Sequence, residues 1–197
     1  MQQKLVAEAF GTFTLALAVL TSISVLDPML ATPVVAALVL GLFVYSIGSV
    51  SGSHINPAVT AGLWSIRKIT TPDAIEYIIA QCAGALAAFF IAGMFVSGLT
   101  LGMVPESMTT FWAELIGMTL FTFGIASVVY GKVADTASGL VIGGSLLLGL
   151  ILAVYLGSAG ILNPAVGLAV GSVSFSYIAG AVAGSMIGMN LYRYLLK

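Results

Sequence analysis

Six apolar segments, each long enough to cross a lipid bilayer, limit this 197-residue chain to a narrow set of folds. They cover residues 5–26, 33–51, 73–98, 110–130, 137–157 and 174–195. A helix needs about 20 residues to span the hydrocarbon core. Charged residues make up 7% of the chain, whereas a water-soluble domain usually carries about 25%. We therefore predict an integral, multi-pass membrane protein, all-α in class, with lipid as its main partner.

The charged residues favour six crossings with both termini in the cytoplasm. With six crossings, all basic residues fall on one side of the membrane. Lys and Arg are enriched on the cytoplasmic side of membrane proteins, so this side is expected to be the cytoplasm. The basic residues are Lys4, Arg67, Lys68, Lys132, Arg193 and Lys197. The other side holds Asp27 and Glu106. The first segment carries Glu8 and has no convincing cleavage site, so we expect a retained helix. No basic patch suggests a nucleic-acid partner.

Two similar stretches lie outside the six segments and contain the same tripeptide. "SGSHINPAVTAGL" covers residues 51–63 and "SAGILNPAVGLAV" covers residues 158–170. Asparagine is a good N-cap and proline is favoured at the first helical position. The apolar run after Asn56 reaches Ser65, about 15 Å of helix, or half the hydrocarbon thickness. Each stretch therefore predicts a half-helix that enters the membrane and stops midway. The two boxes are Asn56, Pro57, Ala58 and Asn163, Pro164, Ala165.

The chain also repeats internally, with halves at about 1–98 and 110–197. "AEAFGTFTL" at 7–15 is similar to "AELIGMTLF" at 113–121, and "YIIAQCAG" at 77–84 to "YIAGAVAG" at 177–184. Each half has three crossings, so the second copy must be inverted relative to the first. Inverted repeats place a functional site at the bilayer midplane between broken helices. We expect residues 1–197 to form one transmembrane channel domain.

Two half-helix tips meeting in the membrane would face a polar path. A helix that begins in hydrocarbon leaves backbone groups unsatisfied unless it is buried in protein or lines a cavity. Each tip carries about half a positive charge, and each capping asparagine keeps its NH₂ as a donor. The irregular approaches offer carbonyl acceptors; the residues expected there are Gly52, Ser53, His54, Ala159 and Ile161. A path lined by these donors and acceptors suits small neutral polar molecules and opposes cations.

The sequence resembles the major intrinsic protein family, the aquaporins and aquaglyceroporins. The resemblance rests on "HINPAVT", the second "NPA", Glu8 and Glu114, and "AQ" with Gly84. It implies six transmembrane helices plus two re-entrant half-helices, a passive channel without cofactor, and a homotetramer. It also implies that Glu8 and Glu114 brace the loops before the half-helices. The alternative, a proton relay, stays open for these intramembrane carboxylates, as does a switch or a bracing role for His54.

The chain departs from the family at the outer constriction. An arginine usually follows the second box, where this chain has Val166. Gapless spacing from the boxes places the other constriction positions at Ala36, Ile151 and Gly160. None of these four supplies a charge or several donors, as arginine would. We therefore expect an apolar, wider constriction that passes water or neutral solutes such as glycerol, urea and ammonia.

Other functions are less consistent with the sequence. An intramembrane enzyme is disfavoured because one histidine and one cysteine give no nucleophile–base spacing and no metal cluster. Formate or ammonium channels also use inverted repeats, but the double Asn-Pro-Ala points away from them. A non-conducting member with a structural or assembly role remains the main alternative.

Overall fold

The computed structural model describes residues 1–23 and 28–197, and the side chains from residue 31 onward after the gap. The regular secondary structure of the described residues is helical, apart from one isolated β-bridge between Met103 and Val173. The elements in order are α1 (Gln2–Ile23), α2 (Pro28–Ser51), α3 (Pro57–Ser65), α4 (Thr71–Ala92), α5 (Met108–Val129), the 3₁₀ turn η1 (Asp135–Ala137), α6 (Ser138–Tyr155), α7 (Pro164–Ala169) and α8 (Phe175–Leu195).

The long helices follow the six predicted segments, with two differences at their ends. α2 begins at Pro28, five residues before the expected start, because proline suits a first helical position. α4 ends at Ala92, although the apolar segment continues to residue 98. Among the described helices, five are long and apolar enough to cross a membrane: α1, α2, α4, α5 and η1–α6. α8 is the less apolar sixth, 21 residues long and packed along α5.

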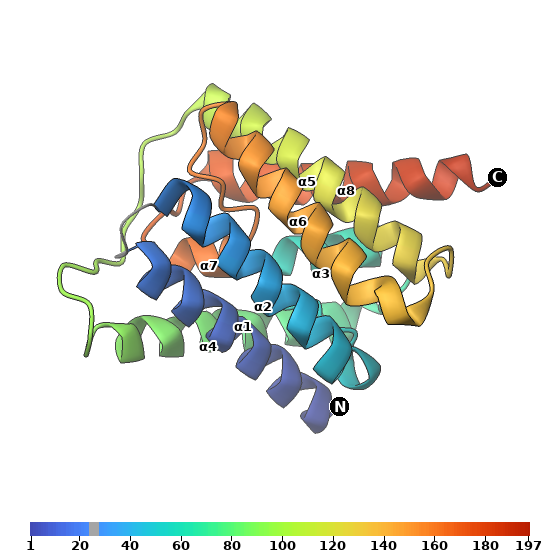
Figure 1. The fold of residues 1–197 in the computed structure, drawn as a ribbon, viewed down its shortest axis with the longest axis horizontal. Helices are drawn as coiled ribbons and strands as arrows, with labels where there is room; N and C mark the ends of the chain where they lie inside the picture. Colours follow the sequence, from blue (N-terminus) through green and yellow to red (C-terminus); the bar gives the residue numbers. More distant parts are fainter. Residues whose placement is uncertain (24–27) are drawn as a thin grey trace.

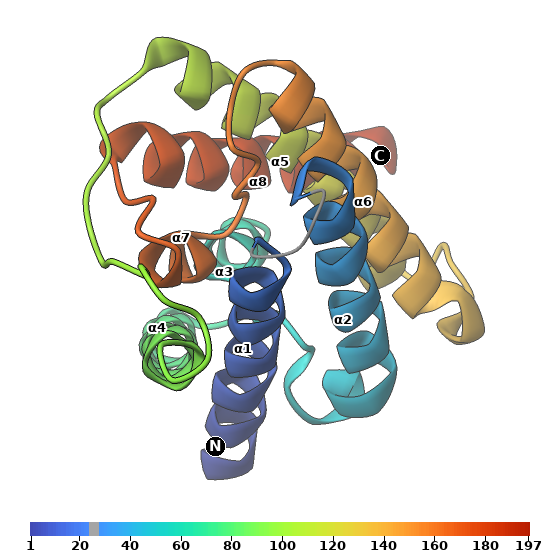
Figure 2. The same cartoon turned by 60° about the vertical axis from the view of Figure 1, so that its left-hand side comes forward.

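The packing repeats between the two halves of the chain (Figure 1). α1 packs on α2 and α4, and α5 packs in the same way on α6 and α8. Each half-helix packs on the last long helix of the other half, α3 on α8 and α7 on α4. Figure 2 shows α3 in the middle of the bundle and α7 beside it, between α4 and α8. The two halves are thus interlocked through their half-helices.

Equivalent glycines bring the outer helices of each half into close contact. A Cβ on Gly84 would overlap the carbonyl oxygen of Ala9, and one on Gly184 would overlap that of Leu115. Ala9 follows Glu8 and Leu115 follows Glu114, so the two contacts are the same contact in the two repeats. Small residues at such positions let membrane helices approach closely. These contacts fix α4 against α1 and α8 against α5.

The connections divide between the two ends of the bundle. The N-terminus, the α3–α4 loop, the α5–α6 connection and the C-terminus lie at one end, on the right in Figure 1. The basic residues of the chain lie in or next to these segments. Glu106 lies in the α4–α5 connection at the opposite end. Asp27, which we expected on that side as well, falls outside the described residues.

Candidate functional site

Both half-helices begin at a capping asparagine followed by proline. Asn56 Oδ1 accepts hydrogen bonds from the backbone N–H groups of Ala58 (2.8 Å) and Val59 (3.4 Å). Asn163 Oδ1 accepts in the same way from Ala165 (3.1 Å) and Val166 (3.3 Å). Each cap satisfies donors that a helix start leaves free. The geometry explains why each box contains asparagine and proline in this order.

The two asparagine amides also join the halves of the chain. Asn56 Nδ2 donates to the carbonyl oxygen of Leu162 at 2.9 Å, and Asn163 Nδ2 donates to that of Ile55 at 3.0 Å. The two half-helix tips therefore meet, each bound to the loop before the other. An amide NH₂ has two N–H donors, so one N–H of each group is left for a further acceptor.

Glu8, from α1, organises the loop before α3. Its Oε1 accepts from the Ser51 hydroxyl (2.6 Å) and the His54 N–H (2.9 Å). Its Oε2 accepts from the Ile55 N–H (2.6 Å) and Gln81 Nε2 (2.7 Å). Three of these four donors are N–H groups, so both carboxyl oxygens act as acceptors. The carboxylate is fully buried, and these bonds replace the water it has lost.

Glu114, from α5, makes the equivalent contacts with the loop before α7. It accepts from the Ser158 hydroxyl, from the Ile161 N–H at 3.0 Å and from the Leu162 N–H at 2.7 Å. It makes one contact fewer because the repeat position of Gln81 is Ala181. These hydrogen bonds of the two carboxylates go to loop and helix groups, as a bracing role requires.

The residue before each asparagine is held in a strained backbone conformation. Ile55 has φ 40° and Leu162 has φ 49°, in the left-handed region that large side chains rarely adopt. Each has its N–H bound by a glutamate and its carbonyl bound by the opposite asparagine. Strain of this kind costs about 1–3 kcal/mol and persists where surrounding bonds over-determine it. The four polar side chains thus hold the loops in place.

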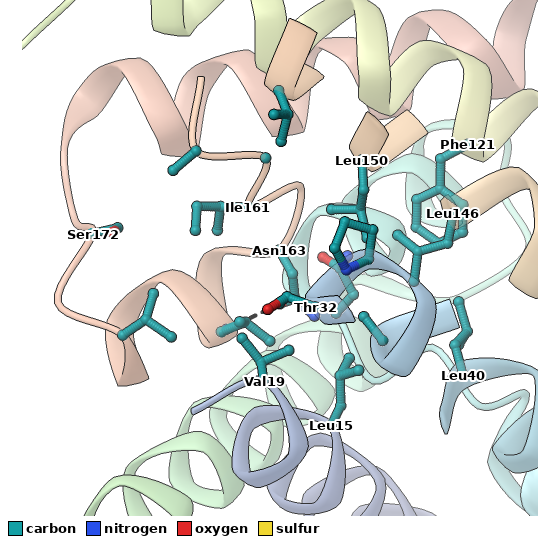
Figure 3. Close-up of a pocket in the computed structure, with 18 of the residues that line it drawn as sticks. Leu15, Val19, Thr32, Leu40, Phe121, Leu146, Leu150, Ile161, Asn163 and Ser172 are labelled. Carbon is teal, nitrogen blue, oxygen red and sulfur yellow. Dashed lines mark hydrogen bonds between the residues drawn. The ribbon is translucent and has the colours of Figure 1, made fainter. Parts of the chain in front are cut away.

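A cavity of about 560 Å³ reaches from the outer end of the bundle, on the side of Ser172, to both asparagines (Figure 3). Its wall is mostly apolar, with contributions from α1, α2, α5, α6 and the loop before α7. The residues that the structure describes in this wall include no Asp, Glu, Lys or Arg. The cavity can hold small neutral molecules within reach of the amides.

The structure places three of the four expected constriction residues on this outer cavity. Ala36, Gly160 and Val166 line it. Ile151 is not among the residues described in its wall, where α6 contributes Leu146, Leu150 and Val154. The expected carbonyl positions divide in two: His54, Ala159 and Ile161 line the outer cavity, whereas Gly52, Ser53 and again His54 line a second one.

The second, inner cavity has a volume of about 580 Å³, and its wall includes Val59 and Leu63 of α3. Lys68 and Asp135 also line it, from the connections at the end of the bundle that carries the termini. The Lys68 ammonium lies 4.9 Å from the centre of the Tyr130 ring. Among the described residues, no group of three His, Cys, Asp or Glu side chains could hold a metal ion.

The sequence reasoning missed several residues of the site. Ser51 and Ser158 bind the two glutamates, and each lies five residues before a box asparagine, a repeat signal that could have identified them. Gln81, a buried amide in an apolar helix, had no expected role beyond the resemblance and proves to bind Glu8. Leu40 and Phe121, which line both cavities, carried no signal that separates them from other apolar residues.

The comparisons with known proteins agree with this geometry. The sequence profile described as Major intrinsic protein matches residues 1–194. Aquaporin AqpM of Methanothermobacter thermautotrophicus is 32% identical over 177 residues, which cover 77% of this chain and 71% of that protein. Glycerol uptake facilitator protein-like 6 of Lactiplantibacillus plantarum is 35% identical over 83% of this chain and 80% of that protein. The aquaglyceroporin of Plasmodium falciparum has the same fold, with a TM-score of 0.72 at 20% identity over 99% of this chain and 95% of that one. The chain belongs to the major intrinsic protein family, and is therefore a membrane channel rather than an enzyme.

Proposed function

We propose that this protein is a passive channel for water and small neutral solutes such as glycerol, urea and ammonia, with a path centred on the two boxes. The observation that carries the proposal is the outer cavity, whose wall includes both Asn56 and Asn163. A solute there meets amide donors beside two helix N-termini, a positive potential that favours oxygen lone pairs and disfavours cations. Similarity to a glycerol facilitator supports the range of solutes.

The outer constriction in this proposal is apolar and admits molecules larger than water. Ala36, Gly160 and Val166 lie in the wall of the outer cavity, and none of them offers a charged group. An arginine at position 166 would add a fixed positive charge and a planar set of donors. Its replacement by valine removes both, so rejection of cations falls to the half-helix tips and rejection of larger neutral solutes weakens.

Flux measurements in proteoliposomes test this function. Stopped-flow swelling under water, glycerol and urea gradients should exceed that of protein-free vesicles for all three. Val166→Arg should lower the glycerol-to-water flux ratio, and Val166→Met, which adds length without charge, separates the effect of charge from that of bulk. Fast water flux with complete rejection of every larger neutral solute would contradict the apolar constriction.

The membrane orientation and the assembly are further parts of the proposal. We place both termini in the cytoplasm, because the segments with Lys or Arg gather at the end of the bundle that carries them. We also propose a homotetramer with one path in each subunit. Protease or thiol-reagent access to a tag at Lys197 in sealed vesicles tests the first, and light scattering of the detergent-solubilised protein tests the second.

The alternative is a non-conducting protein that uses the scaffold for assembly. In that case purified protein of correct fold would give no flux above protein-free vesicles for any of the solutes. The two cavities, of about 560 and 580 Å³, share three described wall residues and favour conduction.

A further inference from the structure

The outer and inner cavities share three of the wall residues that the structure describes. Leu40 of α2, His54 and Phe121 of α5 line both of them, and the remaining wall residues belong to one or the other. Figure 3 shows Ser172 at one end of the outer cavity, Leu40 and Phe121 at the other, and Asn163 between them. A solute that has passed the asparagines from outside must therefore still pass these three side chains. We call them the waist.

The waist is closely packed and held in position. Phe121 is 1% exposed and is the largest fully buried side chain, and Leu40 is 3% exposed. The His54 ring contacts Thr60 Oγ1 through Nδ1 at 3.1 Å and lies 5.0 Å from the Tyr77 ring. The third side of the waist is thus fixed by a hydrogen bond and an aromatic contact. The outer constriction residues Ala36, Gly160 and Val166 are small by comparison.

The aromatic ring at the waist breaks the internal repeat. Phe121 lies seven residues after Glu114, and Leu15 lies seven residues after Glu8. Leu15 lines the outer cavity but not, in the described wall, the inner one. The phenylalanine at the waist therefore comes from the second half and has no counterpart at the repeat position in the first half.

We propose that the waist of Leu40, His54 and Phe121, and not the outer constriction, selects solutes by size in this channel. The inference rests on the proposed channel function and specifies where its selectivity lies. The Leu40 and Phe121 side chains offer no hydrogen bonds, and His54 Nδ1 is already engaged by Thr60. The waist therefore discriminates by cross-section and not by the number of hydroxyl or amide groups. The solutes that pass are slim neutral molecules such as water and urea, and branched or alkylated analogues of the same polarity are retarded.

The test compares urea with dimethylurea in proteoliposomes, after subtraction of flux through protein-free vesicles. The wild-type protein should pass urea at least about tenfold faster, since a pocket discriminates one or two extra methyl groups by roughly that factor. Phe121→Leu should raise the dimethylurea-to-urea flux ratio about tenfold. Leu40→Ala, on the opposite wall, should raise the ratio as well, and provides a second variant if the first does not fold.

Two controls separate the effect of the waist from that of the outer constriction and from a general loosening of α5. Phe123→Leu makes the same chemical change two residues along α5. The Phe123 ring lies 5.0 Å from the Tyr192 ring, centroid to centroid, and is not among the residues described in either cavity wall. This control should leave the dimethylurea-to-urea flux ratio unchanged. Val166→Ala widens the outer constriction and should also leave it unchanged. The proposal is overturned if the dimethylurea-to-urea flux ratio responds to Val166→Ala but not to the folded waist variants. It is also overturned if the wild-type protein passes both ureas equally. Absence of all flux in the wild type instead refutes the channel function itself.

Discussion

Replacing Glu8 by glutamine should remove part, and not all, of the support for the loop before α3. The backbone N–H of His54 is bound to Oε1 and that of Ile55 to Oε2. Glutamine offers a single accepting oxygen, so it can serve one of these two fixed donors and turns an NH₂ toward the other. The two side-chain donors adapt more easily, because a hydroxyl rotates and the Gln81 amide has Thr60 as a second partner.

The expected magnitude follows from the number of orphaned backbone donors. One buried, unsatisfied N–H costs about 1–3 kcal/mol, so Glu8→Gln should lower the free energy of unfolding by about that amount. Glu8→Ala orphans both donors and should cost about 2–6 kcal/mol, before any effect of the cavity it leaves. Because Ile55 and Leu162 are held through the two asparagines, solute flux should fall in both variants along with stability.

Equilibrium unfolding in mixed detergent micelles, followed by tryptophan fluorescence, measures these free energies. Trp64 lies in α3, next to the loop that Glu8 holds, and reports on that region directly. Glu76→Gln is the matched control, since Glu76 is exposed on α4 and the same change there should stay within about 0.5 kcal/mol of the wild type. Wild-type stability in Glu8→Gln would refute the reasoning, because an amide replaces the group without loss only where the acid is protonated and one oxygen already acts as a donor.

Three further changes test the packing, the tips and the outer loop. Gly84→Ala should destabilise by about 1–3 kcal/mol, because its Cβ meets the α1 backbone, whereas Gly144→Ala meets nothing within 4 Å and should not destabilise; thermal unfolding compares them. Asn56→Asp keeps the cap but loses the amide donor to the opposite loop, at a cost of about 1 kcal/mol, and should admit cations in a vesicle potassium-flux assay. Hydrogen bonds from the Ser176 hydroxyl and the first N–H groups of α8 hold the pKa of Glu106 below its ordinary value of 4.5. The stabilisation from these hydrogen bonds is therefore complete above pH 4.5, and it is lost as the pH falls through the lowered pKa. Amide exchange in residues 93–107 should therefore quicken in acid, and Glu106→Gln should show the faster exchange already at neutral pH.

The helices and half-helices were predictable because their signals are local. A cap followed by proline fixes where α3 and α7 begin, and both start at the expected proline. Helix ends were less predictable: α4 stops at Ala92 although apolar residues continue. Hydropathy reports a preference for lipid and says nothing about whether the backbone hydrogen-bond ladder continues.

The wall of the path was less predictable than the scaffold. Spacing from the second box indicated Ile151, whereas Leu150 lines the outer cavity, because the rotation of α6 depends on how it packs against α2 and α5. Glu106 was counted simply as a charge opposite the basic residues, but it binds the N–H groups of Phe175 and Ser176 at the start of α8. Contacts between segments about 70 residues apart carry no local signature in a single sequence.

The residues that follow the repeat and those that break it have different roles. Glu8 with Glu114, Asn56 with Asn163 and Gly84 with Gly184 make the same contacts in both halves, and these contacts hold helices and loops in place. A two-fold scaffold requires such pairs to stay matched, because each half supports the other. Solutes move along a single path, so the residues of its wall need not match between the two halves. Positions that differ between the repeats can therefore determine which solutes pass. The main example is Phe121, whose equivalent position in the first half is Leu15.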